Sequence, residues 1–284
     1  MQMAKALLIS LQQRGMKVFP DVNTCWHFDN KVWEKYLLES VDAPAVPSYV
    51  FYSEREAIEW LEKTTFPKVF KLKGGAGASN VMLVRTKQEG QKLIRQAFGR
   101  GFLQYRWQSK MKEAWRKYKL GNASLRDVMR PVKYGLRRYP TTFDHYHGHE
   151  IGYVYFQDFI PNNDSDLRVI VIGDKLMAEK RYVREGDFRA SGSGHFEYGS
   201  IPEDVMEIAF TTAEKLRMQT VAFDFIFENS QPLIVEMSYG FGTHGIEHSG
   251  GYWTRDHQWH EAKQIDFCGW MVENLIDNQR NEQS

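Results

Sequence analysis

The chain of 284 residues contains 37 lysines and arginines against 36 aspartates and glutamates, so its formal net charge is +1 and indicates no particular partner. Two cysteines, Cys25 and Cys268, provide neither a disulfide framework nor a metal-binding spacing, which favours a reducing compartment. No apolar run has the length of a signal peptide or a transmembrane segment, and we therefore expect a cytoplasmic protein.

The first elements along the chain are short helices and strands. A helix is predicted over 3–14, ending at Gly15, and a short strand over 17–20. A strand over 49–52 precedes a helix over 53–63, which opens with a Ser-x-x-Glu capping box.

Between these elements, Asp29 begins a second helix with an apolar stripe of Val32, Trp33, Tyr36 and Leu37. Lys31 lies in the first turn, where a cation opposes the helix dipole. That position suits a ligand contact, although a solvated lysine is the simpler interpretation.

A glycine-rich loop follows, between two predicted strands, and contains Gly74, Gly75, Gly77 and Ser79. Such loops turn backbone N–H groups toward anions. Lysines alternate with apolar residues in and after the first strand, so all three could share one face: Lys68, Lys71 and Lys73. A triphosphate site and a solvated hairpin with a glycine turn both remain open, because the loop matches neither a Walker nor a Rossmann motif.

Residues 95–149 have a different composition, with 13 lysines and arginines but 3 acidic residues. Apolar residues recur every fourth position at Leu103, Trp107, Met111 and Trp115, which predicts a basic amphipathic helix. Such a helix can lie on an anionic membrane or nucleic acid, cover a site, or simply pack on its own domain. His145, His147 and His149 alternate, but no cysteine or acidic pattern accompanies them as in a zinc site.

From residue 152 onward the pattern is rich in β-strands. Predicted strands cover 153–160, 166–172 and 175–183, and the last two pair across Gly173-Asp174. A polar loop with Arg189 leads to a helix over 203–217, which Pro202 opens. After the loop at 239–251, a helix over 265–278 fades into a polar tail.

The residues 221–238 form two apolar runs around a polar break, which predicts an antiparallel hairpin. Asp224 lies inside the first run and Glu236 ends the second. A carboxylate in an apolar strand is costly unless it is neutralised. The two carboxylates could face one side and bind Mg²⁺, or Asp224 could be a hydrogen-bonded core residue with Glu236 in water.

The order of these residues, more than any one motif, resembles the ATP-grasp superfamily and within it the RimK-like ligases, which join amino acids to a carboxylate. The resemblance covers most of 15–248 and is most specific at Asp166-Leu-Arg168 and Gly186-Asp-Phe-Arg189. It implies an α+β ATP-grasp fold in which two α+β subdomains clasp ATP, with the N-terminal domain of the family largely missing.

The resemblance implies these domains: an N-terminal remnant (1–28), a small subdomain (29–94), a basic aromatic insert (95–149), a large subdomain (150–278) and a tail (279–284). The insert could replace the missing domain on the substrate side.

The resemblance also implies a role for each matching residue. Phosphate contacts would come from Lys31, Lys71 and the loop of Gly74, Gly75, Gly77 and Ser79. Adenine would lie beside Gln157, Asp158, Phe159 and Ile160, and the ribose would meet Asp166. The catalytic residues would be Arg168, Arg181 and Arg189, and the ligands of Mg²⁺ (or Mn²⁺ in its place) would be Asp224, Glu236 and Ser238.

Two positions depart from the family pattern. Ser238 and Ser191 stand where the family usually has asparagine. Because a hydroxyl is a weaker ligand than an amide carbonyl, one or two Mg²⁺ ions remain open.

We therefore expect an ATP- and Mg²⁺-dependent ligase that forms amides through an acyl phosphate. Its substrates would be a small-molecule, peptide or glycan carboxylate and an amine. A kinase with the same ATP site and a nucleotide-binding protein with degenerate catalysis are the alternatives. We expect no nucleic-acid partner; a homo-oligomer, and a peripheral membrane contact through the insert, remain open.

Overall fold

The computed structural model describes residues 2–75, 80–103, 107–119, 121, 123–135, 145, 148–184, 188–190, 194–243 and 245–281. These residues form two compact units. Unit 1 comprises 1–46 and 160–284, and unit 2 comprises 47–159. This division differs from the expected domain boundaries: the helix after Asn30 lies in unit 1, and the basic segment lies in unit 2.

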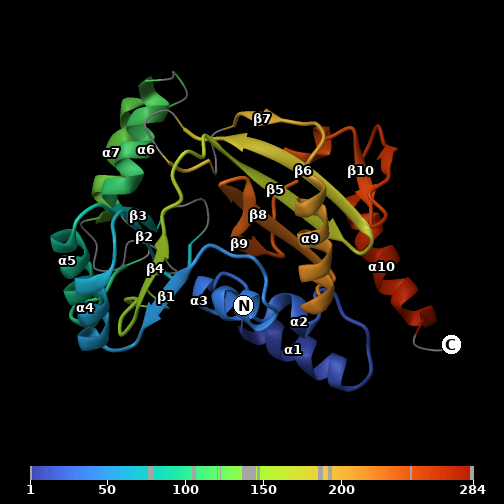
Figure 1. Cartoon of the computed structure of the whole chain (residues 1–284), viewed down its shortest axis with the longest axis horizontal. Coiled ribbons are helices and arrows are strands. Elements are labelled where there is room, and N and C mark those ends of the chain that lie inside the picture. The colour runs from blue at the N-terminus through green and yellow to red at the C-terminus, as the bar shows by residue number, and fades with distance from the viewer. Residues whose placement is uncertain are drawn as a thin grey trace. The chain divides into compact units, whose positions relative to one another are not determined.

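Unit 2 is a four-stranded antiparallel sheet with helices (Figure 1). In chain order its elements are β1 (Ser48–Phe51), α4 (Glu54–Lys63), β2 (Lys68–Lys71), β3 (Val81–Val84), α5 (Lys87–Phe98), α6 (Trp107–Lys119), α7 (Leu125–Gly135) and β4 (Val154–Asp158). The strand order is β1-β4-β2-β3. Phe70 and Phe156 from the sheet pack with Leu61 of α4 and Ile94 of α5, so two helices cover one face.

Unit 1 contains the larger sheet. Its elements are α1 (Gln2–Gln13), α2 (Val22–Cys25), α3 (Lys31–Ser40), β5 (Ser165–Ile172), β6 (Lys175–Tyr182), β7 (Phe196–Glu197), α9 (Glu203–Lys215), β8 (Thr220–Glu228), β9 (Gln231–Ser238), the 3₁₀ turn η1 (Ile246–His248), β10 (Gly251–Thr254), β11 (Trp259–Glu261) and α10 (Phe267–Asn281). The strand order is β11-β10-β6-β5-β8-β9, and β7 pairs with the edge of β6.

The two faces of this sheet follow from alternation along each strand. On one face, Val169 of β5 and Phe223 of β8 pack with Ala209 and Phe210 of α9, which lies over the sheet (Figure 1). The opposite face has a smaller apolar cluster that includes Ile170. Charged residues occupy the rest of that face and form the candidate site described below.

The predicted hairpin at 221–238 is confirmed as β8 and β9. Asn229 and Ser230, at the turn, both have positive φ, as a type I′ turn requires. The register shifts between Asp224 and Phe225, because Val235 is an extra residue on β9. Such bulges re-aim side chains, and this one lies beside two of the predicted metal ligands, Asp224 and Glu236.

Most predicted elements are confirmed, including the Ser53 cap of α4, whose Oγ accepts the Glu56 N–H at 3.4 Å. The strand over 17–20 is wrong: no strand forms there, and the Val18 carbonyl instead accepts a hydrogen bond from the side chain of Gln219.

The helix α3 also differs from its prediction. Asn30, rather than Asp29, caps it, and its side chain accepts the Trp33 N–H at 3.3 Å. The predicted apolar stripe is only partly right, because Val32 is buried whereas Trp33 and Tyr36 are exposed. The buried face of α3 instead includes the charged residues Lys31 and Glu34, along with Leu38.

Candidate active site

Six charged side chains share one face of the large sheet, and we call them the charged belt: Asp166, Arg168, Glu179, Arg181, Asp224 and Glu236. Four of them stand in one row across β6, β5, β8 and β9. In the strand register Glu179 is opposite Arg168, Arg168 is opposite Asp224, and Asp224 is opposite Glu236. The other two, Asp166 and Arg181, are cross-strand partners two residues further along. Side chains two residues apart on a strand face the same side.

Asp224 is the centre of the belt. Arg168 binds it with two parallel hydrogen bonds, Nε to Oδ1 at 2.8 Å and Nη2 to Oδ2 at 2.9 Å. Arg181 reaches the same Oδ2 with Nη2 at 2.8 Å. Arg181 also binds Asp166 with two bonds of 2.7 Å. Bidentate guanidinium–carboxylate pairs are strong and geometrically specific, so these residues form one connected network.

The network sets the protonation of its carboxylates. Burial alone would favour the protonated form of Asp224, but the guanidinium groups of Arg168 and Arg181 outweigh it and hold its pKa below the ordinary value. Burial raises the pKa of Asp166 to about 6, against the opposing effect of Arg181. Asp224 is therefore ionised throughout the neutral range, whereas Asp166, although mostly ionised at pH 7, takes up a proton as the pH falls through about 6.

Glu179, at the end of the row, was not among the predicted site residues. Its side chain is buried, burial raises its pKa, and Oε2 has no hydrogen-bond partner within the described residues. Gly245 is close: a Cβ added there would lie 2.0 Å from Oε2. A carboxylate between Ala178 and Lys180 in a predicted strand was the signal that could have identified it.

Lys31 extends the belt at its other end. Its buried Nζ lies 3.2 Å from Glu236 Oε1. Burial opposes its charged form, but the carboxylates of Glu236 and Glu34 outweigh burial and raise its pKa. The solvated-lysine interpretation is therefore wrong, and a buried cation stands beside a predicted metal ligand.

The predicted metal ligands lie together and fit a hard cation. Asp224 and Glu236 are cross-strand neighbours, and Asp224 Oδ1 accepts a single hydrogen bond from the belt, which leaves it a lone pair. Ser238 follows on the same face of β9, where its Oγ donates to the Gly240 carbonyl at 3.0 Å and accepts from the Gly240 N–H at 3.2 Å. Across the described residues, no group of three His, Cys, Asp or Glu side chains forms a metal cluster.

The loop after β6 is described in part. Arg189 lies there with its guanidinium 5.9 Å from the Phe188 ring, and its carbonyl accepts the Arg184 N–H at 3.2 Å. Gly186, Asp187 and Ser191 lie outside the described residues, so the catalytic role of Arg189 stays a prediction.

Unit 2 holds the other predicted nucleotide-binding residues except Ile160, which is the first residue of unit 1 after the boundary. Lys71 and Gln157 lie on one face of its sheet; Gln157 Nε2 donates to Ser48 Oγ at 3.1 Å. Lys68 and Asp158 pair at 2.5 Å on the opposite face. The prediction that Lys68 and Lys71 share a face is therefore wrong, because an odd separation along a strand reverses the side.

The glycine loop between β2 and β3 is described at its two ends. Gly75 has a φ of 113°, which favours glycine, and Asn80 Nδ2 donates to the Gly74 carbonyl at 3.1 Å. Gly77 and Ser79 lie outside the described residues. Phe159 and Ile160 follow Asp158 at the boundary between the two units.

The alternating histidines show no sign of a zinc site in the described part of the chain. The ring Nδ1 of His149 lies 2.7 Å from the Arg100 carbonyl, and His147 lies outside the described residues.

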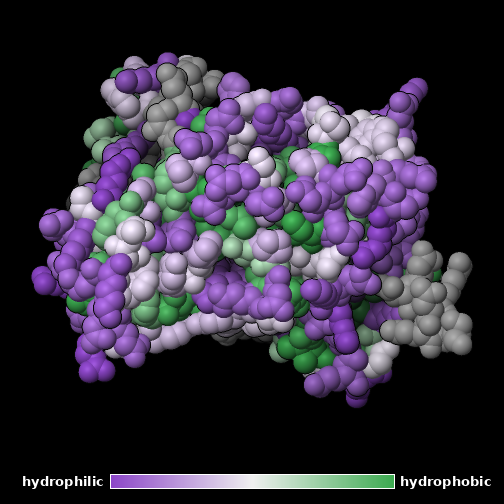
Figure 2. Space-filling model, in the orientation of Figure 1, coloured by the Kyte–Doolittle hydropathy of each residue, from purple (hydrophilic) through white to green (hydrophobic). Residues whose placement is uncertain are grey.

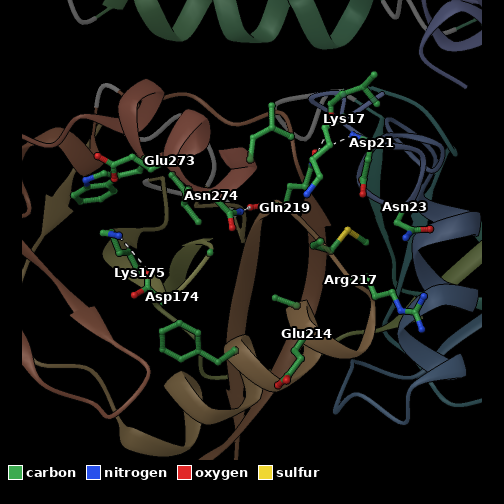
Figure 3. A pocket seen from close by; sticks show the side chains of 18 of the residues that line it. Lys17, Asp21, Asn23, Asp174, Lys175, Glu214, Arg217, Gln219, Glu273 and Asn274 are labelled. Carbon is green, nitrogen blue, oxygen red and sulfur yellow. Dashed lines mark hydrogen bonds and ion pairs between the residues drawn. The ribbon is translucent and has the colours of Figure 1, made fainter. Parts of the chain in front are cut away.

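A cavity of about 1030 Å³ in unit 1 contains none of the predicted site residues. Figure 3 shows Asp174 and Lys175 on one side of it and Lys17 and Asp21 on the other. Its floor includes Ile172, four residues from Arg168 on β5, which corresponds to roughly 13 Å. Several of its charges pair internally, such as Lys175 with Asp174 at 3.0 Å, so we do not assign it to the belt.

Residues 148–253 match the family model of the RimK-like ATP-grasp domain. This segment carries all six belt residues, and the resemblance to RimK-like ATP-grasp proteins is thereby confirmed. None of the described helices is long and apolar enough to cross a membrane.

Among curated relatives, the ribosomal protein bS6–L-glutamate ligase of Escherichia coli O139:H28 is 31% identical over 103 residues. The match covers 35% of this chain and 34% of that protein, about a third of each.

Two solved structures resemble the whole fold. Biotin carboxylase of Campylobacter jejuni, in complex with β-γ-ATP, gives a TM-score of 0.59 at 14% identity and covers 95% of this chain and 51% of that one. The ATP-grasp ligase PsnB, with a minimal precursor, Mg and ADP, gives 0.53 at 14% identity and covers 98% and 68%. The predicted α+β ATP-grasp fold is confirmed.

Proposed function

We propose that this protein is an ATP- and Mg²⁺-dependent ligase that joins a carboxylate to an amine through an acyl phosphate. The observation that carries the proposal is the charged belt, in which two arginines and two predicted metal carboxylates lie side by side in the segment that matches the RimK-like domain. The name of the bS6–L-glutamate ligase and the Mg and ADP of the PsnB complex support the same class of reaction.

The belt suits phosphoryl transfer because that reaction needs its developing negative charge neutralised more than it needs covalent help. In this proposal Asp224 and Glu236 hold Mg²⁺, which would neutralise the phosphates of ATP, and Ser238 is a weaker third ligand. Arg168 and Arg181 are fixed by Asp224 and Asp166, so their guanidiniums are oriented before substrate arrives. Lys31 and Arg189 add positive charge for the phosphates and the substrate carboxylate.

Unit 2 would contribute the remaining nucleotide contacts. Lys71 is buried on the same face as Gln157, where its cation suits a phosphate. The loop that includes Gly74, Gly75, Gly77 and Ser79 would close over the phosphates and exclude water from the acyl phosphate. Adenine would lie beside Gln157–Ile160. Asp158 would act through its carbonyl, because Lys68 holds its side chain and Pro47 accepts its N–H.

The proposed reaction has two steps. An oxygen of the substrate carboxylate attacks the γ-phosphorus of ATP, the bond to the β-phosphate oxygen breaks, and ADP leaves. The amine then attacks the acyl carbon, loses a proton, and expels inorganic phosphate. We propose a peptide, amino-acid or sugar-acid carboxylate as acceptor.

A second candidate is a nucleotide-binding protein with degenerate catalysis. The engagement of Ser238 Oγ by Gly240 favours it, because the two hydrogen bonds leave that hydroxyl only one lone pair for a metal.

Hydroxylamine trapping separates these functions. The protein is incubated with Mg²⁺-ATP, hydroxylamine, and carboxylates that include glutamate-ended peptides and sugar acids. A ligase gives one acyl hydroxamate per ADP, and Asp224→Asn abolishes both products. ADP and a phosphorylated hydroxyl without hydroxamate would show a kinase. Nucleotide binding without ADP release across the set would favour the degenerate protein.

A further inference from the structure

The helical hairpin of α6 and α7 carries none of the predicted nucleotide-binding residues. The two helices pack against each other, and Figure 1 shows them at one end of unit 2. Residues 107–135 contain eight lysines and arginines and two acidic residues, a net charge of +6. Figure 2 shows hydrophilic and hydrophobic residues side by side over this hairpin. The proposed ligase chemistry uses none of these side chains.

The outer surface of α7 combines exposed apolar groups with cations. Val128 faces inward, but Leu125 and Met129, four residues apart, are 57% and 62% exposed. At 100° per residue, Arg126 and Arg130 are each offset by 100° in the same direction from the apolar residue just before them, so both lie along one side of this exposed pair. Some apolar side chains of α7 therefore remain exposed although Val128 is buried.

The acidic residue of α7, Asp127, offsets only part of this charge, because Arg126, Arg130 and Lys133 leave the helix with a net charge of +2. Asp127 serves the helix N-terminus, where its Oδ2 accepts the Ser124 N–H at 2.9 Å and its own N–H donates to Ser124 Oγ at 3.3 Å. The cap indicates that α7 is a defined helix.

The neighbouring helix α6 carries exposed aromatic rings beside lysines. Trp115 is 46% exposed, and its ring lies 5.6 Å from that of Tyr118. Lys112 and Lys119 are exposed at spacings of three and four residues from Trp115, so they lie on the same side of the helix. Tryptophan and tyrosine are the side chains that favour the boundary between lipid headgroups and acyl chains.

From these observations we propose that the α6–α7 hairpin docks on an anionic phospholipid surface. Cations beside exposed aliphatic and aromatic side chains are the composition of helices that lie in a membrane interface. A phosphate backbone would use the cations but leave Leu125 and Met129 in water. The inference goes beyond the proposed ligase function and does not depend on it.

The test is co-sedimentation of the full chain with vesicles. One set is phosphatidylcholine with one third phosphatidylglycerol, and the other is phosphatidylcholine alone. We expect at least tenfold tighter binding to the anionic vesicles, and a decrease as salt is raised.

Two variants separate the charges from the apolar side chains. Arg126→Gln/Arg130→Gln should weaken binding on the order of twentyfold, because each cation near an anionic surface contributes roughly fivefold. Leu125→Ser/Met129→Ser should weaken it at least tenfold through lost apolar burial.

The matched control is Val272→Ser/Ile276→Ser in α10, which removes an apolar pair of the same spacing, 56% and 46% exposed, beside Glu273 rather than cations. That control should bind as the unaltered protein does.

Equal binding to both vesicle types, no binding to either, or equal loss in the α10 control would overturn the proposal. Binding of a nucleic-acid duplex that the serine pair on α7 leaves unchanged, with no vesicle binding, would assign the cations to nucleic acid instead. Each variant is first compared by its unfolding midpoint, so that a misfolded protein is not taken for a weak binder.

Discussion

The two faces of the large sheet in unit 1 are built from alternate residues of the same strands, yet they bury opposite kinds of side chain. One face gives Val169, Phe223 and Phe225 to the core beneath α9. The other gives Arg168 and Asp224 to the charged belt. The apolar face gains stability from burial and packing, whereas the belt exchanges water for ion pairs with little net gain.

One face of the sheet therefore contributes mainly to stability, and the other holds the residues of the candidate active site. A change beneath α9 should act on stability first. A change in the belt should remove function, and it should cost stability only to the extent that it leaves a buried charge without compensation. The following changes are ordered from the largest expected effect to the smallest.

The largest effect is expected from Phe223→Ala on the apolar face. Phe223 is fully buried, and truncating such a ring leaves a cavity that costs roughly 4 kcal/mol of the free energy of unfolding. Urea unfolding measures the loss. A loss below about 1 kcal/mol would contradict the assignment of this face as the main core.

The next effect comes from Asp224→Asn, which keeps the shape but removes the charge that holds two guanidiniums. Because the arginines remain buried, we expect a loss of about 3 kcal/mol. Adding Arg168→Gln should restore part of it in a double-mutant cycle. Strictly additive losses would show that the two residues do not compensate each other.

His27 shows what a buried ionisable group does without such compensation. Its ring is fully buried, and the hydrogen bond that the Thr24 backbone offers it outweighs neither burial nor the charge of Lys5. Burial, assisted by the charge of Lys5, lowers its pKa to about 4. The unfolded state, with a pKa near 6.5, takes up the proton first as the pH falls.

The contribution of neutral His27 is therefore complete above about pH 6.5 and is lost progressively down to about pH 4, by an amount approaching 3 kcal/mol. His27→Leu should remove this pH dependence. Urea unfolding of both proteins across that range isolates the difference, because every other group titrates alike in the two. Parallel curves would show that His27 is already protonated or exposed.

The smallest effect on stability is expected from Glu236→Gln at the rim of the belt. Its side chain is 35% exposed, and Glu34 remains near Lys31, so we expect a loss of only about 1 kcal/mol. The same change should abolish Mg²⁺-dependent turnover in the trapping assay. Full turnover in this variant would remove Glu236 from the proposed metal site.

Local patterns made much of the fold predictable. Apolar, β-rich runs bounded by turn residues identified β5, β6, β8 and β9, and the hairpins among them join neighbours in sequence. The paired strands β10 and β11 were not predicted, because each is short and rich in polar and aromatic residues. The turn residues of the β8–β9 hairpin were predicted as a break, and they adopt the positive φ that asparagine tolerates.

The candidate site was predictable as a set of residues but not as a network. Asp224 and Glu236 were recognised as carboxylates on paired strands. The ion pair between Arg168 and Asp224 was not predicted, because the two residues are 56 positions apart and meet only through the pairing of β5 with β8. Glu179 was missed for the same reason, since only its register against Arg168 places it in the row.

The most direct test of the central claim, that the belt is part of a Mg²⁺-ATP site, is the free energy of unfolding with and without Mg²⁺-ATP. At a hundredfold excess over Kd, binding should add about 2.7 kcal/mol. The account predicts that this gain requires Mg²⁺ and disappears in Glu236→Gln, whose own loss of stability is small. No gain at millimolar Mg²⁺-ATP, or the same gain in the variant, would contradict it.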